Sequence, residues 1–351
     1  MVVLGAGVIG MAVALELAEA SIACTLVDPT PGHGASWAAA GMLSRAAEVA
    51  PGEEALLDDL GAAAAMWPAF ARRVQSAGAV DVGYAAVGSL LVGHSQSDAR
   101  EAARFAGLAR AAGIEIESLS AEDVERLEPT LAGGLRGGFL LPGDHSVDNR
   151  RLVEGLLAAL KARGATILED RCVAVAPLAQ GLRCSLEHQG DVVADRLVVA
   201  TGVAPPLQGL EDLGLPQVRP VRGATLRLSA TPGAALPTRT VRAVVRGVQC
   251  YLVPRGDREL VVGATSEEQG FATIARAGGV FVLLDAARSV YPGLDELALD
   301  EVSVGLRPAT SDHLAFVGVL EDPRIVAAVG HYRNGVLLAP LTARRVLELL
   351  A

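Results

Sequence analysis

The stretch Met1-Val2-Val3-Leu4-Gly5-Ala6-Gly7-Val8-Ile9-Gly10 decides the fold of this chain. Its first four residues are apolar and predict a strand, and the Ala- and Leu-rich residues 11–20 predict a helix directly after the glycines. A second predicted strand, residues 22–27, ends at Asp28. Strand, glycine turn, helix and strand in this order form one βαβ unit, which indicates an α/β fold.

The three glycines of this stretch have the spacing of a dinucleotide-binding turn. Gly5 permits the tight turn, Gly7 lets the backbone approach a pyrophosphate, and Gly10 lets the helix pack closely on the strand. The N–H groups at the start of the helix favour phosphate. Asp28 follows at the distance expected for a carboxylate that accepts from ribose hydroxyls. These residues predict a dinucleotide site and leave FAD and NAD both open.

The composition limits the classes of protein to which the chain can belong. Its 351 residues leave room for about two domains. Hydrophobic residues make up 51% and charged residues 20%, which excludes intrinsic disorder. The net charge of −10 gives no general attraction to nucleic acid. We expect neither a nucleic-acid partner nor a membrane span, because no uncharged apolar run approaches the ~20 residues that a span needs.

The cysteines and histidines indicate no metal site. Cys24, Cys172, Cys184 and Cys250 form no CxxC pair, and the six histidines show no metal-ligand spacing. Scattered cysteines are typical of a reducing compartment, and no basic residue precedes the apolar start of the chain. We therefore expect a cytoplasmic protein.

The remaining pattern predicts two interleaved domains. Residues 32–43 are small and read as a loop, and residues 222–265 alternate like an antiparallel sheet with a hairpin at Gly256-Asp257. Further helices are predicted over 54–78, 99–113, 149–163 and 335–350, and further strands over 89–92, 165–168, 172–176, 182–186, 196–200 and 325–329.

Four further segments could carry chemistry. Ser36-Trp37-Ala38-Ala39-Ala40-Gly41-Met42-Leu43 would let backbone pass close to a flat ligand, and the strand 197–200 ends in Thr201-Gly202. Arg307 lies between apolar residues and proline, where a guanidinium could hold a carboxylate with help from the Tyr251 hydroxyl. Residues 330–340 form a strand end, a polar turn and a helix start. Each segment also has a purely structural interpretation, such as an ordinary turn, an ion pair or a core aromatic residue.

Taken in order, these segments resemble the FAD-dependent amine oxidases of the D-amino-acid oxidase family, and within it the glycine oxidases of thiamine biosynthesis. The sharpest matches are residues 36–43, Tyr251-Leu-Val-Pro254 with Val261-Val-Gly-Ala-Thr265, Gly305-Leu-Arg-Pro308 and residues 330–340. The resemblance covers nearly the whole chain and favours FAD over NAD. It implies a Rossmann-like FAD-binding domain, residues 1–80, 145–215 and 300–351, interleaved with an antiparallel-sheet substrate domain, residues 81–144 and 216–299.

The resemblance also assigns site residues. It implies that Arg307 and Tyr251 are catalytic and bind the substrate carboxylate, and that Ser266 and Arg333 contact the substrate. The residues implied to bind FAD are Gly5, Gly7, Val8, Ile9, Gly10, Asp28, Ser36, Ala38, Ala39, Ala40, Gly41, Met42, Val173, Thr201, Gly202, Arg333, Asn334, Gly335, Val336 and Leu337. No cysteine lies in the segments around Gly305 and Gly330, so we expect non-covalent FAD.

The implied reaction is oxidative deamination of glycine or another small amine or D-amino acid. It would yield the imine or 2-oxo acid, ammonia and, with molecular oxygen, hydrogen peroxide, and the protein could form a homo-oligomer. One departure from the family is Ser266, where methionine is typical, and it leaves the preferred substrate open. Two alternatives remain at this point, a D-amino-acid dehydrogenase with a quinone acceptor and a non-catalytic flavin-binding subunit.

Overall fold

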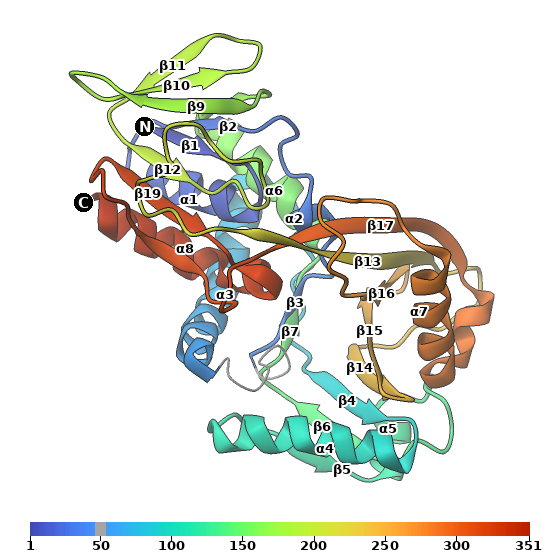
Figure 1. The fold of residues 1–351 in the computed structure, drawn as a ribbon. Coiled ribbons are helices and arrows are strands. Elements are labelled where there is room, and N and C mark those ends of the chain that lie inside the picture. The colour runs from blue at the N-terminus through green and yellow to red at the C-terminus, as the bar shows by residue number, and fades with distance from the viewer. Residues whose placement is uncertain (46–53) are drawn as a thin grey trace.

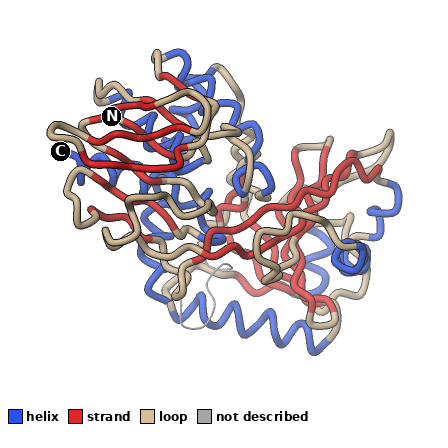
Figure 2. The backbone as a smooth tube through the Cα atoms, turned by 45° about the horizontal axis from the view of Figure 1, so that its top comes forward, coloured by secondary structure: helices blue, strands red, loops and turns tan. Residues whose placement is uncertain are grey.

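The computed structural model describes residues 1–45 and 54–351. Over these residues the longer strands gather in two groups at opposite ends of the molecule (Figure 2). One group is a six-stranded sheet, here the first sheet, with a three-stranded cover sheet above it. The other is an eight-stranded sheet, here the second sheet.

The first sheet has the order β18 (Phe316–Val319), β19 (Ile325–Val329), β12 (Leu197–Val199), β1 (Val2–Leu4), β2 (Thr25–Val27) and β8 (Thr166–Leu168). All neighbours pair in parallel except β18, which is antiparallel to β19. Its helices are α1 (Val8–Glu19), α3 (Leu57–Gly78), α6 (Asn149–Ala162) and α8 (Gly335–Leu350), which lie together on one face (Figure 1). Parallel strands joined by helices confirm the predicted Rossmann-like α/β half of the fold.

Alternate residues of the first sheet face two different cores, as strand geometry requires. Val3, Leu26 and Val198 pack against the helices, whereas Leu4 and Val199 pack against the cover sheet. The cover sheet has the order β11 (Asp191–Ala194), β10 (Leu182–Leu186) and β9 (Cys172–Pro177). Because the strands of the first sheet are buried on both faces, their near-continuous apolar sequence follows from the fold.

The second sheet has the order β17 (Ala298–Ala309), β13 (Arg219–Ser229), β16 (Glu259–Gly263), β15 (Val248–Arg255), β14 (Thr240–Val245), β4 (Ser89–Gly93), β6 (Gly138–Leu141) and β5 (Glu117–Leu119). Neighbouring strands of this sheet pair in antiparallel fashion except β14 and β4, which are parallel. The helix α7 (Ala277–Val290) covers one face and buries a core that includes Leu226, Leu252 and Val262. The other face of the sheet borders the cavity described below.

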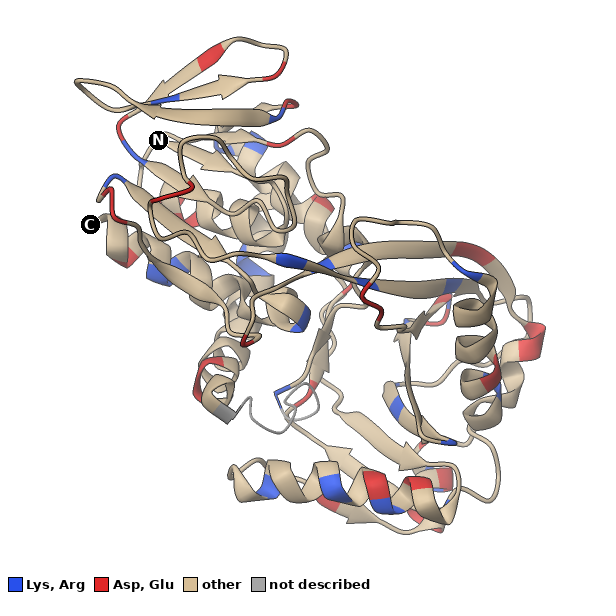
Figure 3. Cartoon of the chain, viewed as in Figure 1, with Lys and Arg blue, Asp and Glu red and all other residues tan. Residues whose placement is uncertain are grey.

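Further helices, turns and one strand pair complete the described residues. They are α2 (Ala35–Ala38), α4 (Gln96–Ala111), α5 (Ala121–Leu127), the 3-10 turns η1 (Glu54–Leu56), η2 (Pro292–Glu296) and η3 (Tyr332–Asn334), and the pair β3 (Met42–Leu43) with β7 (His145–Ser146). Figure 3 shows acidic and basic residues along α4, as expected for a helix with a solvent-facing side. No helix in residues 1–45 and 54–351 has the length and apolar character needed to cross a membrane.

Several predicted bounds need correction. The predicted loop 32–43 contains α2 and β3, and the predicted strand 22–27 pairs only over Thr25–Val27 because the Ile22 N–H still caps α1 through the Leu17 carbonyl. The helix predicted from residue 99 begins at Gln96, because Ser95 and Asp98 form a capping box. The helix α7 and the strand β17 were not predicted. The interleaved two-part fold is confirmed, while the proposed domain boundaries stay a prediction.

Candidate active site

One cavity of about 940 Å³ lies where the carboxyl ends of the first sheet meet the open face of the second sheet. The predicted site residues that line it are Gly5, Gly7, Val8, Ile9, Asp28, Ser36, Ala38, Ala39, Ala40, Gly41, Met42, Val173, Thr201, Gly202, Tyr251, Ser266, Arg307, Arg333, Gly335 and Val336. Gly10, Asn334 and Leu337 are predicted site residues that are absent from this lining. The fold therefore brings segments from both ends of the sequence to one cavity.

The glycine turn after β1 leaves no room for side chains. Gly5 has φ +97°, and a Cβ there would lie 2.3 Å from the Ala200 carbonyl oxygen on the neighbouring strand connection. A Cβ at Gly10 would lie 1.9 Å from the Gly5 carbonyl oxygen, so this residue serves close packing. The Asp28 carboxylate accepts from the Ala6 N–H at 2.7 Å and holds the turn beside the end of β2.

Two helix N-termini whose N-cap residues make no side-chain capping bond open on the cavity. The first residues of α1 and α8 line it, and neither Gly7 nor Asn334 makes a side-chain capping bond. The Val8 N–H donates to Ser36 Oγ at 2.9 Å, which leaves the Ser36 hydroxyl proton available to a ligand. Unpaired helix N–H groups and the helix dipole favour anionic groups. A dinucleotide pyrophosphate at α1 and the ring system of a flavin at α8 fit this arrangement.

The small residues 36–42 are held by their carbonyl oxygens. Asn149 Nδ2 donates to the carbonyls of residues 36 and 37 at 2.9 Å, Thr225 Oγ1 donates to that of residue 38 at 3.1 Å, and Arg255 donates to that of residue 40. Burial lowers the pKa of Arg255 to about 10. These side chains come from α6 and the second sheet, so the backbone along the cavity is positioned by both halves of the fold.

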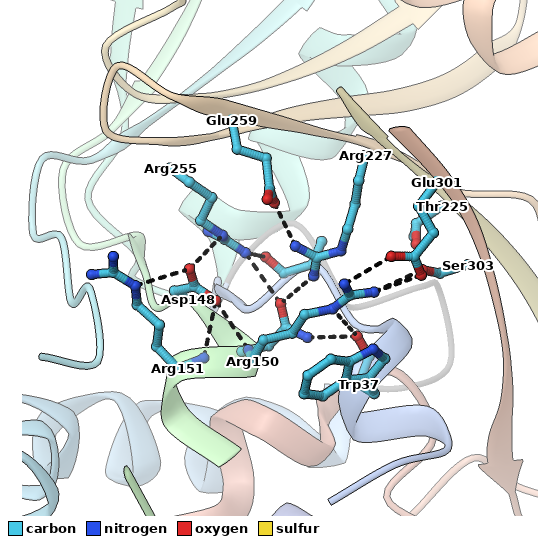
Figure 4. A network of polar contacts seen from close by, with 12 residues as sticks. Trp37, Asp148, Arg150, Arg151, Thr225, Arg227, Arg255, Glu259, Glu301 and Ser303 are labelled. Carbon is cyan, nitrogen blue, oxygen red and sulfur yellow. Dashed lines mark hydrogen bonds and ion pairs between the residues drawn. The ribbon is translucent and has the colours of Figure 1, made fainter. Parts of the chain in front are cut away.

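A cluster of ion pairs lies behind this segment (Figure 4). Arg150 donates to both oxygens of Glu301 at 2.8 and 2.7 Å and lies 4.4 Å from the ring centroid of Trp37. Arg227 pairs with Glu259. The hydrogen bond from Arg150 lowers the pKa of Glu301 to about 2. Removing one partner from a partly buried ion pair of this kind destabilises the fold, because the other charge is left uncompensated.

Two glycines of the second sheet make room for the predicted substrate-binding side chains. Tyr251 pairs with Gly263, and a Cβ at Gly263 would lie 2.5 Å from the Tyr251 hydroxyl oxygen. A Cβ at Gly223 would lie 2.2 Å from Nη1 of Arg307. Because Gly263 pairs with Thr225, the two glycines are diagonal neighbours on one face. The phenol and the guanidinium therefore lie over adjacent bare positions of the same sheet face.

The Arg307 guanidinium has carbonyl partners on the protein side. Nη1 donates to the carbonyl oxygens of Thr265 at 3.1 Å and of Arg222 at 3.4 Å. In the described part of the chain no carboxylate pairs with Arg307. Carbonyl contacts orient the guanidinium without neutralising it, so its charge remains available to an anion in the cavity.

Other charged groups of the cavity lining are mostly cationic. Arg242 lies directly opposite Tyr251 in the sheet, and Arg333 lies over the Tyr332 ring at 4.8 Å from its centroid. His331 is buried beside Thr342 Oγ1 at 2.9 Å, and burial lowers its pKa to about 4, which keeps it neutral. Among the described lining residues, Asp28 carries the one carboxylate.

Tyr251 was predicted from the sequence, but its pairing with Gly263 and the individual roles of Gly223, Arg242 and His331 were not. Gly263 and Tyr251 each lie six residues from Asp257, so the predicted hairpin already contained the signal for their pairing. Gly223, Arg242 and His331 carried no such signal, because their roles depend on contacts between distant segments.

Comparison with known proteins identifies the family to which the chain belongs. A family profile described as FAD dependent oxidoreductase matches residues 1–349. The bifunctional protein ThiO/ThiG of Synechocystis sp. is 33% identical over 354 residues, which cover 100% of this chain and 51% of that protein. The chain thus spans about half the length of its ThiO/ThiG relatives. Glycine oxidase of Geobacillus kaustophilus is 31% identical over 351 residues, covering 99% of this chain and 91% of that protein.

Solved structures show the same fold. Glycine oxidase from Geobacillus kaustophilus superimposes with a TM-score of 0.89 at 29% identity, covering 99% of this chain and 93% of that one. Iminodiacetate oxidase from Chelativorans sp. gives a TM-score of 0.86 at 24% identity, with 99% and 94% covered. These matches confirm the resemblance and the fold class that were drawn from the sequence. The chain belongs to the FAD-dependent oxidoreductase family, and FAD is its cofactor.

Proposed function

We propose that this enzyme oxidises glycine or another small amine or D-amino acid at the carbon between its nitrogen and its carboxylate. The products would be the imine, which hydrolyses to a 2-oxo acid and ammonia, and hydrogen peroxide from oxygen. The relative named glycine oxidase supports this reaction, and a relative of Rhizobium etli named putative thiamine biosynthesis oxidoreductase ThiO supports a role in thiamine biosynthesis. The observation that carries the proposal is the Arg307 guanidinium, oriented by carbonyls beside the Tyr251 phenol.

In the proposed complex Arg307 holds the substrate carboxylate through two N–H groups, and the Tyr251 hydroxyl donates a further hydrogen bond. A planar guanidinium matches a carboxylate in this way, and the diagonal spacing of Gly223 and Gly263 leaves room for a small one. The residues at the two uncapped helix starts hold the FAD pyrophosphate and flavin. When bound, FAD supplies the two-electron acceptor for the oxidation.

The remaining catalytic effect comes from orientation and charge. The cationic lining formed by Arg242, Arg307 and Arg333 disfavours a protonated amine, and the neutral amine is the form that can be oxidised. His331 is neutral but already bonded to Thr342, so we assign it no role as a base. In this proposal the enzyme accelerates the oxidation by holding the substrate in a fixed orientation relative to the flavin, and it needs no side-chain base.

An anaerobic titration of the purified holoenzyme tests the proposal. Glycine, sarcosine, D-alanine and D-proline are added in turn while the flavin absorbance is followed. Bleaching by at least one of them, followed by peroxide formation when air is admitted, is the expected result. Bleaching without peroxide would favour a dehydrogenase with another acceptor. An unchanged flavin spectrum with all four would refute the proposal.

A variant of Arg307 links the reaction to the residue. Arg307→Lys keeps the charge but loses the planar pair of N–H groups, so one hydrogen bond to the carboxylate disappears. Bonds to charged groups contribute about 1.5–3 kcal/mol, which corresponds to roughly a 10- to 150-fold loss of kcat/KM. FAD content should not change, because Arg307 lies on the second sheet. Unchanged glycine kinetics would show that Arg307 has a structural role.

A further inference from the structure

The segment that joins β16 to α7, residues 264–276, is here called the strap. It crosses beside β13 and β17 as the orange loop of Figure 1, and four of its residues, Ala264, Thr265, Ser266 and Thr273, line the cavity. The strap therefore forms part of the cavity wall next to the second sheet. The side chains that hold the strap in this position, described next, do not line the cavity.

One buried arginine contacts both ends of the strap. Arg222 on β13 is 2% exposed and lies on the opposite face of that strand from Gly223. Its guanidinium pairs with Glu267 near the start of the strap and donates to the Ile274 carbonyl at 3.1 Å near its end. The backbones of Arg222 and Glu267 also exchange two hydrogen bonds of 2.9 Å.

The same pair fixes the surroundings of Arg307. The carbonyl oxygens that accept from Arg307 belong to Thr265, in the strap, and to Arg222 itself. Thr265 is held in turn by the Ala224 N–H, which donates to Thr265 Oγ1 at 2.9 Å. The orientation of the Arg307 guanidinium thus depends on backbone that the Arg222–Glu267 pair anchors.

We propose that Arg222 and Glu267 are positioning residues for carboxylate binding, acting through the strap on Arg307. The inference rests on the proposed function in that Arg307 binds the substrate carboxylate. Arg222 is buried while the Glu267 side chain is 29% exposed, so removal of the Glu267 charge leaves the Arg222 guanidinium buried and uncompensated. The strap then relaxes and the Thr265 carbonyl leaves Arg307. The substrate is then held less tightly, while the flavin end of the cavity keeps its own contacts.

The matched test compares Glu267→Gln with Glu268→Gln in the FAD-loaded enzyme. Glu268 is the next residue of the strap, and its side chain is 72% exposed in a pair with Arg219. Acetate serves as the probe for carboxylate binding, followed by the change in flavin absorbance, and glycine kinetics give KM and kcat separately. FAD dissociation is measured for each variant.

For Glu267→Gln we expect the acetate Kd and the glycine KM to rise together by about 3- to 30-fold, the size of typical couplings between linked residues. The kcat and FAD dissociation should stay within about twofold, since a positioning role separates KM from kcat. Arg222→Lys keeps the charge facing Glu267 but cannot also reach Ile274, so a smaller rise in both constants is expected. Glu268→Gln should match the wild type.

Different results overturn different parts of this reasoning. Glu267→Gln and Arg222→Lys enzymes that bind acetate like the wild type would overturn the positioning role alone. An equal change in Glu268→Gln, or a parallel loss of kcat and FAD, would also overturn it, because the effect would then be general. Should Glu267→Gln fail to fold, Arg222→Lys decides the question. A wild-type enzyme that binds neither acetate nor glycine would overturn both proposals.

Discussion

A methyl group at position 223 should disable substrate binding while leaving the fold intact. The Cβ of Gly223→Ala would lie 2.2 Å from Nη1 of Arg307 and 2.5 Å from its Cζ, which is too close for non-bonded heavy atoms. The atoms in conflict belong to the far end of a flexible side chain, so the guanidinium moves and the strand does not. Gly223 has no positive φ, so alanine can adopt its backbone conformation without strain.

The size of the effect follows from what the guanidinium loses. A displaced Arg307 gives up its contacts with the Thr265 and Arg222 carbonyls and at least one hydrogen bond to the substrate carboxylate. One bond to a charged group contributes about 1.5–3 kcal/mol, so kcat/KM for glycine should fall roughly 10- to 150-fold. Thermal stability should be unchanged or slightly higher, because replacing glycine lowers the entropy of the unfolded chain.

A double-mutant cycle decides whether the effect passes through Arg307. Gly223→Ala, Arg307→Ala and the double variant are compared by kcat/KM and by melting temperature. In the Arg307→Ala background the extra methyl group meets no guanidinium and should have no further effect. Gly107→Ala, at a position where nothing lies within 4 Å of the new Cβ, is the control. Full additivity of the two losses, or wild-type kinetics for Gly223→Ala, would refute the steric argument.

Three further predictions concern other parts of the molecule. FAD should be released intact when the protein is denatured, because the segments around Gly305 and Gly330 contain no cysteine that could hold the flavin covalently; flavin that stays with the precipitated chain would contradict this. Ser266→Met should lower the ratio of kcat/KM for D-alanine over glycine by about 10-fold, since added apolar volume in a pocket shifts discrimination by ~1–3 kcal/mol, and an unchanged ratio would place Ser266 outside the substrate's reach. Glu301→Gln should remove part of the acid sensitivity of folding. The folded-state pKa of Glu301, about 2, lies below its ordinary 4.5, so its contribution is complete above pH 4.5 and is lost as pH falls towards 2. Urea midpoints from pH 7 to 3 should therefore converge for the two proteins, and a constant difference would contradict the assignment.

The first sheet was largely predictable because its signals are local. The glycine turn, the strand 325–329 and the helix 335–350 are each indicated by a pattern within a short stretch of sequence. The structure has the strand and the helix at those bounds. The start of α6 was readable for the same reason, since Asp148 accepts from the Arg150 and Arg151 N–H groups as an N-cap.

The second sheet was less predictable because its order is set by pairing between distant segments. The helix α7 contains Gly278 and Gly279 and β-branched valines, so its helical state depends on packing against β15 more than on propensity. The strand β4 pairs with β14, although their residues are more than a hundred positions apart in the sequence. The contacts of Arg222 with the strap could not be predicted either, because Glu267 and Ile274 are distant from Arg222 in the sequence and meet it only in the folded protein.

The order of the elements along the chain also has a consequence for synthesis. The walls of the cavity in which we propose that FAD binds come from both ends of the sequence, with Gly5 and Gly7 before β2 and Gly335 and Val336 after β19. In addition, β19 completes the parallel order next to β12, and α8 buries part of α1. A growing polypeptide therefore holds the phosphate turn long before it holds the opposite wall. We expect FAD to be captured only after residues 325–336 have left the ribosome, so that chains interrupted earlier expose the apolar face of α1 and are open to degradation.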